Sequence, residues 1–355
     1  MAASLKKPAR NGTIDLMKFL FCLLIMLFHT TSLFPGGYIA VEFFFITSGY
    51  LMALSMDREK DSSGDIGTRT VRFILHKACG IFPYYAAAWV LSFLLTIVVK
   101  NYTFSQLFRE LFMSPYNFFM VEMAGNYDMG HRIEGSWYIS AMLLAMAVLY
   151  PVRTKSRNLF DGIIAPLLAL FAVGYFYQRG KGLSATVYYD SSLHMYTGLL
   201  RALTEIPLGC LCYRLRQRLL PEGCVRPGGL RSILLAIPEL FGYAVTFYCA
   251  HRTAHTSFDL ALLFWLSVSV TISFSGCSIT AKYIRGDLFR FLGTFSLMIY
   301  LTHQAVKKQI LIPLGLHTLP LPLYLLLLLA VSSILGWICY AAGNFIRRMF
   351  RKDPA

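Results

Sequence analysis

The stretch that decides the fold is residues 14–33, IDLMKFLFCLLIMLFHTTSL, followed after four residues by residues 38–56, YIAVEFFFITSGYLMALSM. Each run is apolar for about 20 residues, which is long enough to cross roughly 30 Å of hydrocarbon as a helix. Neither run alternates apolar and polar residues as the strands of a transmembrane barrel do. The two runs therefore predict a pair of membrane-spanning helices joined by a short turn.

The composition of the whole chain points to the same solvent. Hydrophobic residues make up 56% of the 355 residues, charged residues make up 14%, and the mean hydropathy is +0.56. A soluble domain could not hide so much apolar surface from water. We predict an all-α, multi-pass protein of the cell membrane.

Ten apolar runs along the chain are long enough to span the membrane. The predicted spans are residues 14–33, 38–56, 78–99, 135–152, 160–177, 196–213, 232–250, 257–275, 288–312 and 319–346. Residues 104–122 form a further apolar stretch, but Arg109, Glu110, Pro115 and Asn117 interrupt it. We expect this stretch to be a half-buried or re-entrant element over the outer face.

The distribution of basic residues sets the orientation. With the amino terminus inside, 24 of the 33 Lys and Arg residues fall on the cytoplasmic side, as the positive-inside rule requires. Both termini are then cytoplasmic, with tails at residues 1–13 and 347–355 on a single transmembrane domain that fills residues 1–355. The net charge of +15 is spread over every inner loop, so a nucleic-acid partner is not expected.

Metal and disulfide chemistry have little support in the sequence. The 8 Cys residues form no CxxC pair and lie mostly within spans or on the inner side. His251 and His255 are four residues apart, but no third ligand accompanies them. We therefore expect no bound metal.

Polar residues within the first span share one side of the helix. Because each residue turns an α-helix by about 100°, the four polar positions of this span fall within a single sector of about 60°. Titratable groups in a bilayer are costly and often mark a site. The four residues are Asp15, Lys18, Cys22 and His29.

The second span carries a carboxylate, Glu42, in an otherwise apolar run. Gly49 lies seven residues later on the same face, where a missing side chain would allow a neighbouring helix to approach closely. The carboxylate could be purely structural, paired with a cation or hydroxyl, or it could take part in catalysis. We expect the Ser48 hydroxyl to bond to the backbone of its own helix.

Two other spans have polar residues near their outer ends. In the span of residues 288–312, the spacings of four, three and four place Ser296, Tyr300, His303 and Lys307 along one edge. Trp137 begins the span of residues 135–152. Interfacial Tyr, Trp and Lys can simply anchor helices at the membrane surface, so these residues have an ordinary alternative explanation.

The predicted topology gathers these residues into two groups. His29, Glu42, Trp137 and His303 all lie in the outer half of the membrane, whereas Lys18, Arg72 and Lys77 lie at the inner ends of their helices. A His next to a carboxylate is a common general base, and the similar depths of His29 and Glu42 predict that they pair. Inner cations suit an anionic cofactor that enters from the cytosol.

Four segments of the chain together resemble acyltransferase family 3, the integral-membrane O-acyltransferases of bacterial surface glycans. The similar segments are IDLMKFLFCLLIMLFHT, GGYIAVEFFFITSGYLMA, SWYISAMLLAMAVLYP and LGTFSLMIYLTHQAV, which follow the family's order over nearly the whole chain. The third helix departs from the family pattern of two or three Arg residues before an apolar-Pro pair. It reads RFILHKACGIFPYY, with His76, Lys77 and Gly80 at those positions.

The resemblance implies a fold of about ten helices, an acyl-CoA such as acetyl-CoA as donor, and His29 as the catalytic residue. We expect Glu42 to assist His29, and Asp15, Lys18, Arg72 and Lys77 to bind the donor. Trp137, Tyr300 and His303 are the predicted acceptor-binding residues. The acceptor would be an extracytoplasmic hydroxyl, such as that of a polysaccharide or peptidoglycan.

A proton-coupled transporter or flippase of a glycan precursor is the main rival. In that protein the intramembrane His and Glu would relay protons. A transporter of this kind would also have inverted repeats and helices broken near the membrane midplane, and the sequence has neither.

Overall fold

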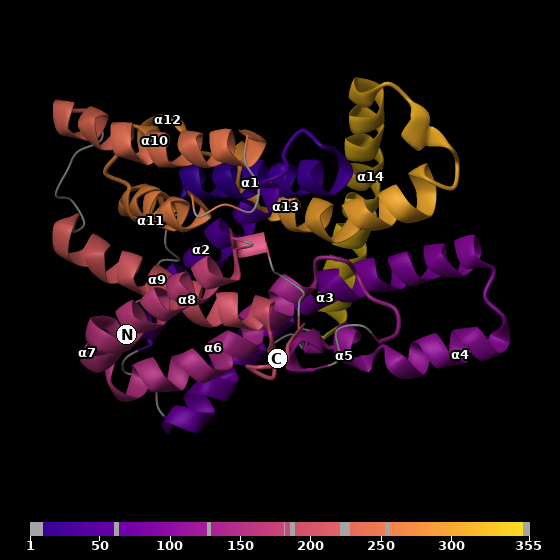
Figure 1. Ribbon diagram of the computed structural model, residues 1–355, viewed down its shortest axis with the longest axis horizontal. Helices are drawn as coiled ribbons and strands as arrows, with labels where there is room; N and C mark the ends of the chain where they lie inside the picture. Colours follow the sequence, from indigo (N-terminus) through magenta and orange to yellow (C-terminus); the bar gives the residue numbers. More distant parts are fainter. Residues whose placement is uncertain are drawn as a thin grey trace.

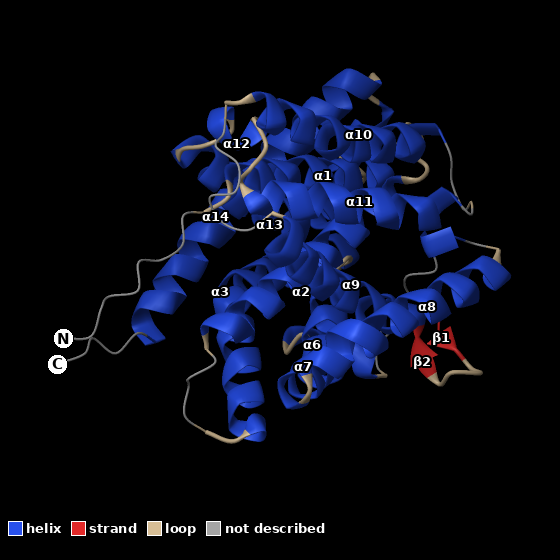
Figure 2. Ribbon diagram, turned by 90° about the vertical axis from the view of Figure 1, so that its left-hand side faces the viewer, coloured by secondary structure: helices blue, strands red, loops and turns tan. Residues whose placement is uncertain are grey.

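A computed structural model shows a bundle of helices with one short β-hairpin at its edge (Figures 1 and 2). It describes residues 10–59, 64–125, 129–180, 182–184, 189–220, 228–252, 256 and 258–350, apart from the side chain of Phe350. Within these ranges, eight helices are long and apolar enough to cross a membrane. The protein is therefore an all-α, multi-pass membrane protein, as the composition predicts.

The ten predicted spans correspond to long helices. These are α1 (Gly12–Thr30), α2 (Ala40–Arg58), α3 (Ile66–Lys100), α6 (Trp137–Lys155), α8 (Ala165–Arg179), α9 (Thr197–Leu219), α10 (Leu230–Arg252), α11 (Phe258–Ser275), α13 (Asp287–Val306) and α14 (Leu321–Phe350). The eight helices that meet this length and hydropathy criterion do not include α9 and α13. Both nevertheless pack against central helices, α9 against α2 and α13 against α1.

Shorter elements connect the long helices. They are η1 (Gly37–Ile39), α4 (Phe104–Met113), α5 (Pro115–Phe118), η2 (Glu122–Ala124), α7 (Arg157–Leu159), the π-helical turn η3 (Phe160–Ile164), η4 (Gly182–Ser184), α12 (Thr280–Tyr283), the π-helical turn η5 (Lys307–Leu311) and η6 (Leu316–Thr318). Strands β1 (Tyr189–Asp190) and β2 (Met195–Tyr196) pair antiparallel. Figure 2 shows this hairpin below α8.

Helix α3 extends further than the predicted span of residues 78–99. It starts at Ile66 because Asp65 caps it, accepting a hydrogen bond from the Thr68 amide at 3.0 Å. The basic residues Arg72 and Lys77 therefore lie on helical turns rather than in a loop. Their side chains project at fixed intervals along α3.

The stretch of residues 104–122, expected to be half-buried or re-entrant, divides into an exposed first part and a buried second part. None of the residues of α4 is buried, and α4 runs beside the outer part of α3 away from the bundle (Figure 1). A capping box at Thr103 and Gln106 starts this helix. The chain becomes buried only at α5, where the Asn117 side chain enters the bundle.

Helix α2 lies at the centre of the bundle. Of its apolar window, 72% is buried, against 22% for α14 at the periphery. Helices α1, α6, α9 and α11 pack around α2. The residues of α2 therefore meet side chains from several parts of the chain at once.

Two glycines allow α2 and α9 to touch backbone to backbone. A Cβ at Gly49 would lie 1.9 Å from the carbonyl oxygen of Ile206, and one at Gly209 would lie 2.1 Å from that of Ile46. The Cys210 thiol donates to the carbonyl of Gly49 at 3.5 Å. The prediction that Gly49 permits a close helix approach is confirmed.

Replacing Gly49 by Ala should therefore destabilise the protein. The added methyl group forces α2 and α9 apart, which costs about 1–3 kcal/mol for overpacking. The thermal midpoint of the protein in nanodiscs, followed by tryptophan fluorescence, should fall. Gly174→Ala in α8 is the matched control, because its Cβ meets nothing within 4 Å and Ala is the better helix former. Equal midpoints for the two variants would contradict the close packing.

Candidate active site

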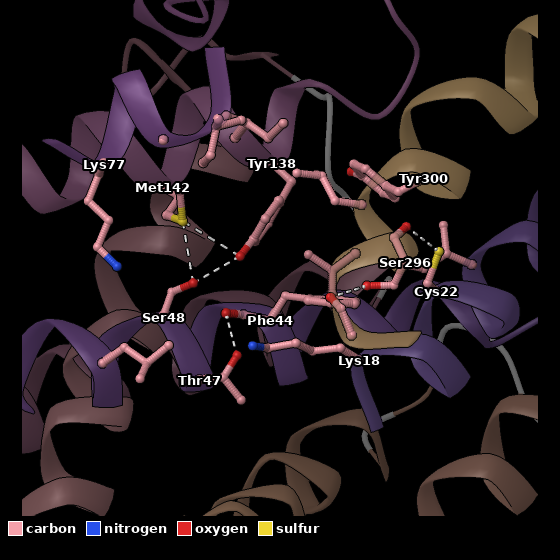
Figure 3. Close-up of a pocket in the computed structure, with 18 of the residues that line it drawn as sticks. Lys18, Cys22, Phe44, Thr47, Ser48, Lys77, Tyr138, Met142, Ser296 and Tyr300 are labelled. Carbon is pink, nitrogen blue, oxygen red and sulfur yellow. Dashed lines mark hydrogen bonds between the residues drawn. The ribbon is translucent and has the colours of Figure 1, made fainter. Parts of the chain in front are cut away.

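A cavity of about 410 Å³ lies between five helices of the bundle (Figure 3). We call it the central cavity. Its walls come from α1, α2, α3, α6 and α13, and include Lys18, Cys22, Ile25, Phe44, Ser48, Lys77, Tyr138, Ser296 and Tyr300. Most of the lining is apolar, with polar groups at separate points, as is usual for a small-molecule site.

The hydroxyl of Ser48 points into the central cavity. Its oxygen lies 3.0 Å from the Tyr138 hydroxyl, and it donates to the sulfur of Met142 at 3.3 Å (Figure 3). The expectation that Ser48 bonds to its own backbone is wrong, because Tyr138 on the adjacent helix α6 offers a partner. Ser48 and Tyr138 thus present two hydroxyls to anything bound there.

The basic residues of the central cavity come from α1 and α3. Lys18 and Lys77 extend their ammonium groups toward the side where Ser48 lies, whereas Tyr300 and Ser296 line the other side (Figure 3). His76 and Gly80 on α3 complete this part of the wall. The predicted donor residues Lys18 and Lys77 are therefore brought together in space.

The other two predicted donor residues differ in their positions. Asp15 is buried and forms ion pairs with Arg10 at 2.7 Å and Lys18 at 3.5 Å. Arg72 is exposed on α3 and lies in the wall of neither the central cavity nor the other cavities described in this structure. Asp15 thus holds Arg10 and Lys18 near it, whereas Arg72 is not part of this group.

His29 and His303 meet beyond the end of the central cavity that carries Tyr300. Their ring centroids are 5.7 Å apart and their planes differ by 26°. Neither ring lines the cavity, but Ile25 and Tyr300, one helical turn before each, do. The structure therefore joins two predicted site residues that lie 274 positions apart in the sequence.

The surrounding backbone fixes the orientation of His303. Its Nδ1 lies 2.8 Å from the carbonyl of Tyr300 and 3.1 Å from that of Ile299, so Nδ1 carries the proton. The buried Nε2 has no hydrogen-bond partner within the described part of the chain. Its lone pair is available close to His29. Lys307 donates to the backbone carbonyl of His29 at the end of α1.

Glu42 has a different partner from the one predicted. Its carboxylate is bound by Arg201 of α9, and among the described residues it makes no contact with His29. Glu205, one turn further along α9, also faces Arg201, with Oε1 3.7 Å from Nε. The cation of Arg201 draws Glu42 toward α9, whereas His29 faces α13.

Trp137 belongs to the same buried group. The guanidinium of Arg201 lies 5.6 Å from the centre of the Trp137 ring, a cation–π arrangement. The Trp137 ring also packs against Phe45 at 6.2 Å. Trp137 does not line the central cavity, whereas the next two residues of α6, Tyr138 and Ile139, do.

The sequence reasoning missed Arg201 and Glu205. Both lie within the span predicted at residues 196–213, in the segment TGLLRALTEIPLG, and two charges four residues apart in such a span are a detectable signal. They are 0% and 2% exposed. Several oxygen and nitrogen atoms of the Glu42–Arg201–Glu205 cluster have no hydrogen-bond partner among the described residues. The cluster is held by charge more than by complete hydrogen bonding.

Another buried carboxylate, Glu122, lies outside the membrane-spanning helices. It accepts hydrogen bonds from Asn117 and from the Ser136 hydroxyl, the latter at 2.7 Å. Asn117 is itself bound by Tyr85 and Trp89 of α3. Burial raises the pKa of Glu122 to about 7, although both hydrogen bonds act to lower it.

This Glu122 network positions the start of α6. Ser136 precedes α6, and the carbonyl of its neighbour Gly135 accepts a hydrogen bond from the Tyr300 hydroxyl. Glu122 therefore braces the segment that holds Tyr300 beside the central cavity.

No group of three His, Cys, Asp or Glu residues suited to a metal ion occurs among the described residues. His251 contacts the backbone of Leu33, and His255 lies outside the described residues. The described cysteines are free thiols.

Comparison with known protein families gives one match. Residues 11–341 match the family model of acyltransferase family 3, described as "Acyltransferase domain". Searches of curated proteins and of solved structures return no match.

Removing the cation of the Glu42–Arg201–Glu205 cluster should destabilise the protein far more than removing all three charges. Arg201→Met leaves Glu42 and Glu205 without a counter-charge, which costs on the order of 3–5 kcal/mol. The combined variant Arg201→Met, Glu42→Gln, Glu205→Gln buries no net charge and should recover most of this loss. Thermal midpoints in nanodiscs measure both. A combined variant as unstable as the single one would contradict the charge argument.

The raised pKa of Glu122 predicts a pH-dependent stability. Between the ordinary carboxyl pKa and about 7, the folded protein binds more protons than the unfolded chain. The stabilisation of the folded state by protonated Glu122 is therefore full below the ordinary carboxyl pKa and is lost as the pH rises through 7. Glu122→Gln lacks the titrating group. The thermal midpoint of wild type relative to Glu122→Gln should therefore rise on going from pH 8 to pH 5.5. Parallel pH profiles would show that Glu122 keeps its ordinary pKa.

Proposed function

Because the chain belongs to acyltransferase family 3, we propose that it transfers an acetyl group from acetyl-CoA, or another acyl group from its acyl-CoA, to a hydroxyl outside the cytoplasm. The acceptor is a cell-surface glycan such as a polysaccharide or peptidoglycan. The family match covers the helices that surround the central cavity. The family match supports an acyltransferase, and the identities of the donor and the acceptor are our proposal.

The central cavity is the observation that carries the proposal. It extends from the cations Lys18 and Lys77 to Tyr300, one turn below the His29–His303 pair. Lys18 and His29 are 11 residues apart on α1, which is about 17 Å of helix. A pantetheine arm is long enough to span this distance. Its thioester would then reach the histidine pair while its phosphates stay near the cations.

His29 acts as the general base in this reaction. Its imidazole removes the proton of the acceptor hydroxyl, the hydroxyl oxygen bonds to the thioester carbonyl carbon, and the carbon–sulfur bond breaks. The departing thiolate takes the proton from the imidazolium, so that the products are the ester and free CoA. Half-buried His29 is open to an acceptor, whereas His303 is 1% exposed.

His303 and Tyr300 position the reacting groups. The free Nε2 lone pair of His303 can accept a hydrogen bond from the acceptor hydroxyl or from the imidazolium of His29, which would stabilise the charge that develops there. Glu42 and Trp137 act indirectly, because they hold α2, α6 and α9 together through Arg201.

The side of the membrane follows from the charge distribution. The proposed orientation puts the start of α1 and the end of α2 in the cytoplasm and the histidine pair near the outer surface. Added acetyl-CoA should therefore support transfer in inside-out vesicles and fail in sealed right-side-out vesicles. A proton-coupled transporter would instead move its substrate without consuming acetyl-CoA.

His29→Ala should lower the rate of acyl transfer by about 10² to 10⁴-fold, the usual share of general base catalysis. The variant loses activity completely if His29 carries the acyl group itself. Purified protein in nanodiscs is assayed for transfer of labelled acetyl from acetyl-CoA to isolated cell-envelope glycan. His317→Ala is the control, because the His317 side chain is exposed and lies in the short η6 turn, outside the walls of the central cavity. Near-normal transfer by His29→Ala would remove the catalytic assignment.

Glu42→Gln in the same assay separates a structural role from a catalytic one. Since Glu42 does not touch His29, the fractional losses of the two single variants should multiply in the double variant. A double variant scarcely worse than His29→Ala would instead mean that the two residues act as one unit.

A further inference from the structure

A larger cavity opens at the end of the bundle where α1 begins. Its volume is about 980 Å³, and its walls come from residues 10–18, the ends of α2, α9 and α11, and the α12–α13 connection. We call it the basic cavity. Among the described residues, five cationic residues and one acidic residue, Asp15, line it; the cations are Arg10, Lys18, Arg58, Arg216 and Arg285.

The basic cavity has a large excess of positive charge. Asp15 is already bound by Arg10 and Lys18. Arg58 and Arg285 are exposed and form no ion pair or hydrogen bond within the described part of the chain. Cations gathered around one cavity repel one another, which is tolerated most easily where an anion is bound.

One wall of the basic cavity is aromatic. Tyr50 of α2 stacks on Phe274 of α11, with ring centroids 3.8 Å apart and planes 5° from parallel. Tyr213 of α9 meets Tyr50 edge to face at 5.2 Å. All three residues line the cavity. An aromatic wall beside guanidinium groups is suited to a ligand that carries both a base and phosphates.

The basic cavity adjoins the central cavity. Lys18 and Leu51 belong to the walls of both. A ligand can therefore leave its anionic end in the basic cavity and pass an uncharged arm by Lys18 toward the histidine pair. An isolated phosphate or a lipid headgroup would use the cations but would have no need of the second cavity.

We propose that the basic cavity binds the 3′-phospho-ADP end of the acyl-CoA donor, and this rests on the proposed function. Arg58 and Arg285 bind the phosphates, the Tyr50–Phe274–Tyr213 wall faces the adenine, and the pantetheine arm passes Lys18 into the central cavity. The site thereby assigns donor binding to residues of α2 and the α12–α13 connection in place of Arg72, which lines neither cavity.

Binding of CoA to the protein in nanodiscs, measured by calorimetry, tests this site. Arg58→Gln and Arg285→Gln should each raise the Kd for CoA by about 10-fold, because each removes a charge-assisted hydrogen bond. Lys155→Gln, at an exposed position on the last turn of α6, is the matched control and should leave the Kd unchanged. In the transfer assay the same two variants should raise the KM for acetyl-CoA with little change in kcat.

Ligand fragments separate the nucleotide from other anions. 3′,5′-ADP should compete with CoA, dephospho-CoA should bind more weakly than CoA, and inorganic phosphate at equal concentration should not compete. Vesicles of anionic lipid that displace CoA would point to a headgroup site and overturn the proposal.

The outcomes distinguish this site from the proposed function itself. Normal CoA affinity in Arg58→Gln, in Arg285→Gln and in the double variant would overturn the basic cavity as the nucleotide site and leave the acyltransferase function in place. Failure of the wild-type protein to bind CoA or to transfer from acetyl-CoA would overturn both. Thermal midpoints equal to wild type show that the variants are folded, since neither Arg makes a contact that the fold requires.

Discussion

Arg201 determines how the central helices fit together. A guanidinium at 0% exposure within a membrane protein must meet counter-charges inside the bundle, because lipid offers none. Glu42 of α2 and Glu205 of α9 supply them, and Trp137 of α6 covers the cation. The glycine contacts at Gly49 and Gly209 bring α2 and α9 close enough for this pairing. Charge and close packing therefore act on the same interface.

The position of the central cavity follows from this central packing. With α2 held against α9, its opposite side faces α1, α3, α6 and α13, and the central cavity lies between them. Ser48 and Tyr138 are hydrogen-bonded to each other in its wall. The histidine pair lies beyond one end of the cavity and the basic cavity adjoins the other. The acyl-CoA donor that we propose is anionic at one end and carries its thioester at the other, in the same order as the basic cavity and the histidine pair.

Much of the site was accessible from helical spacing and span depth. The polar sector of α1 placed Lys18, Cys22 and His29 on one side, and in the structure Lys18 and Cys22 line the central cavity while His29 contacts His303. The edge of α13 likewise placed Ser296, Tyr300 and His303 together. Such reasoning works within one helix because the helix fixes the angles. It failed for Glu42, whose partner depends on which neighbouring helix approaches and not on depth alone.

The sequence by itself determined the solvent, the all-α fold, the ten long helices and the polar edges of α1 and α13, because hydropathy and helical period are local properties of the chain. Only the tertiary structure decided the partners. It put Arg201 between two carboxylates, turned Ser48 toward Tyr138, left α4 outside the bundle and gathered Arg10, Arg58 and Arg285 around one cavity. These contacts join residues far apart in the sequence, and their formation depends on the packing of whole helices, for which no local pattern codes.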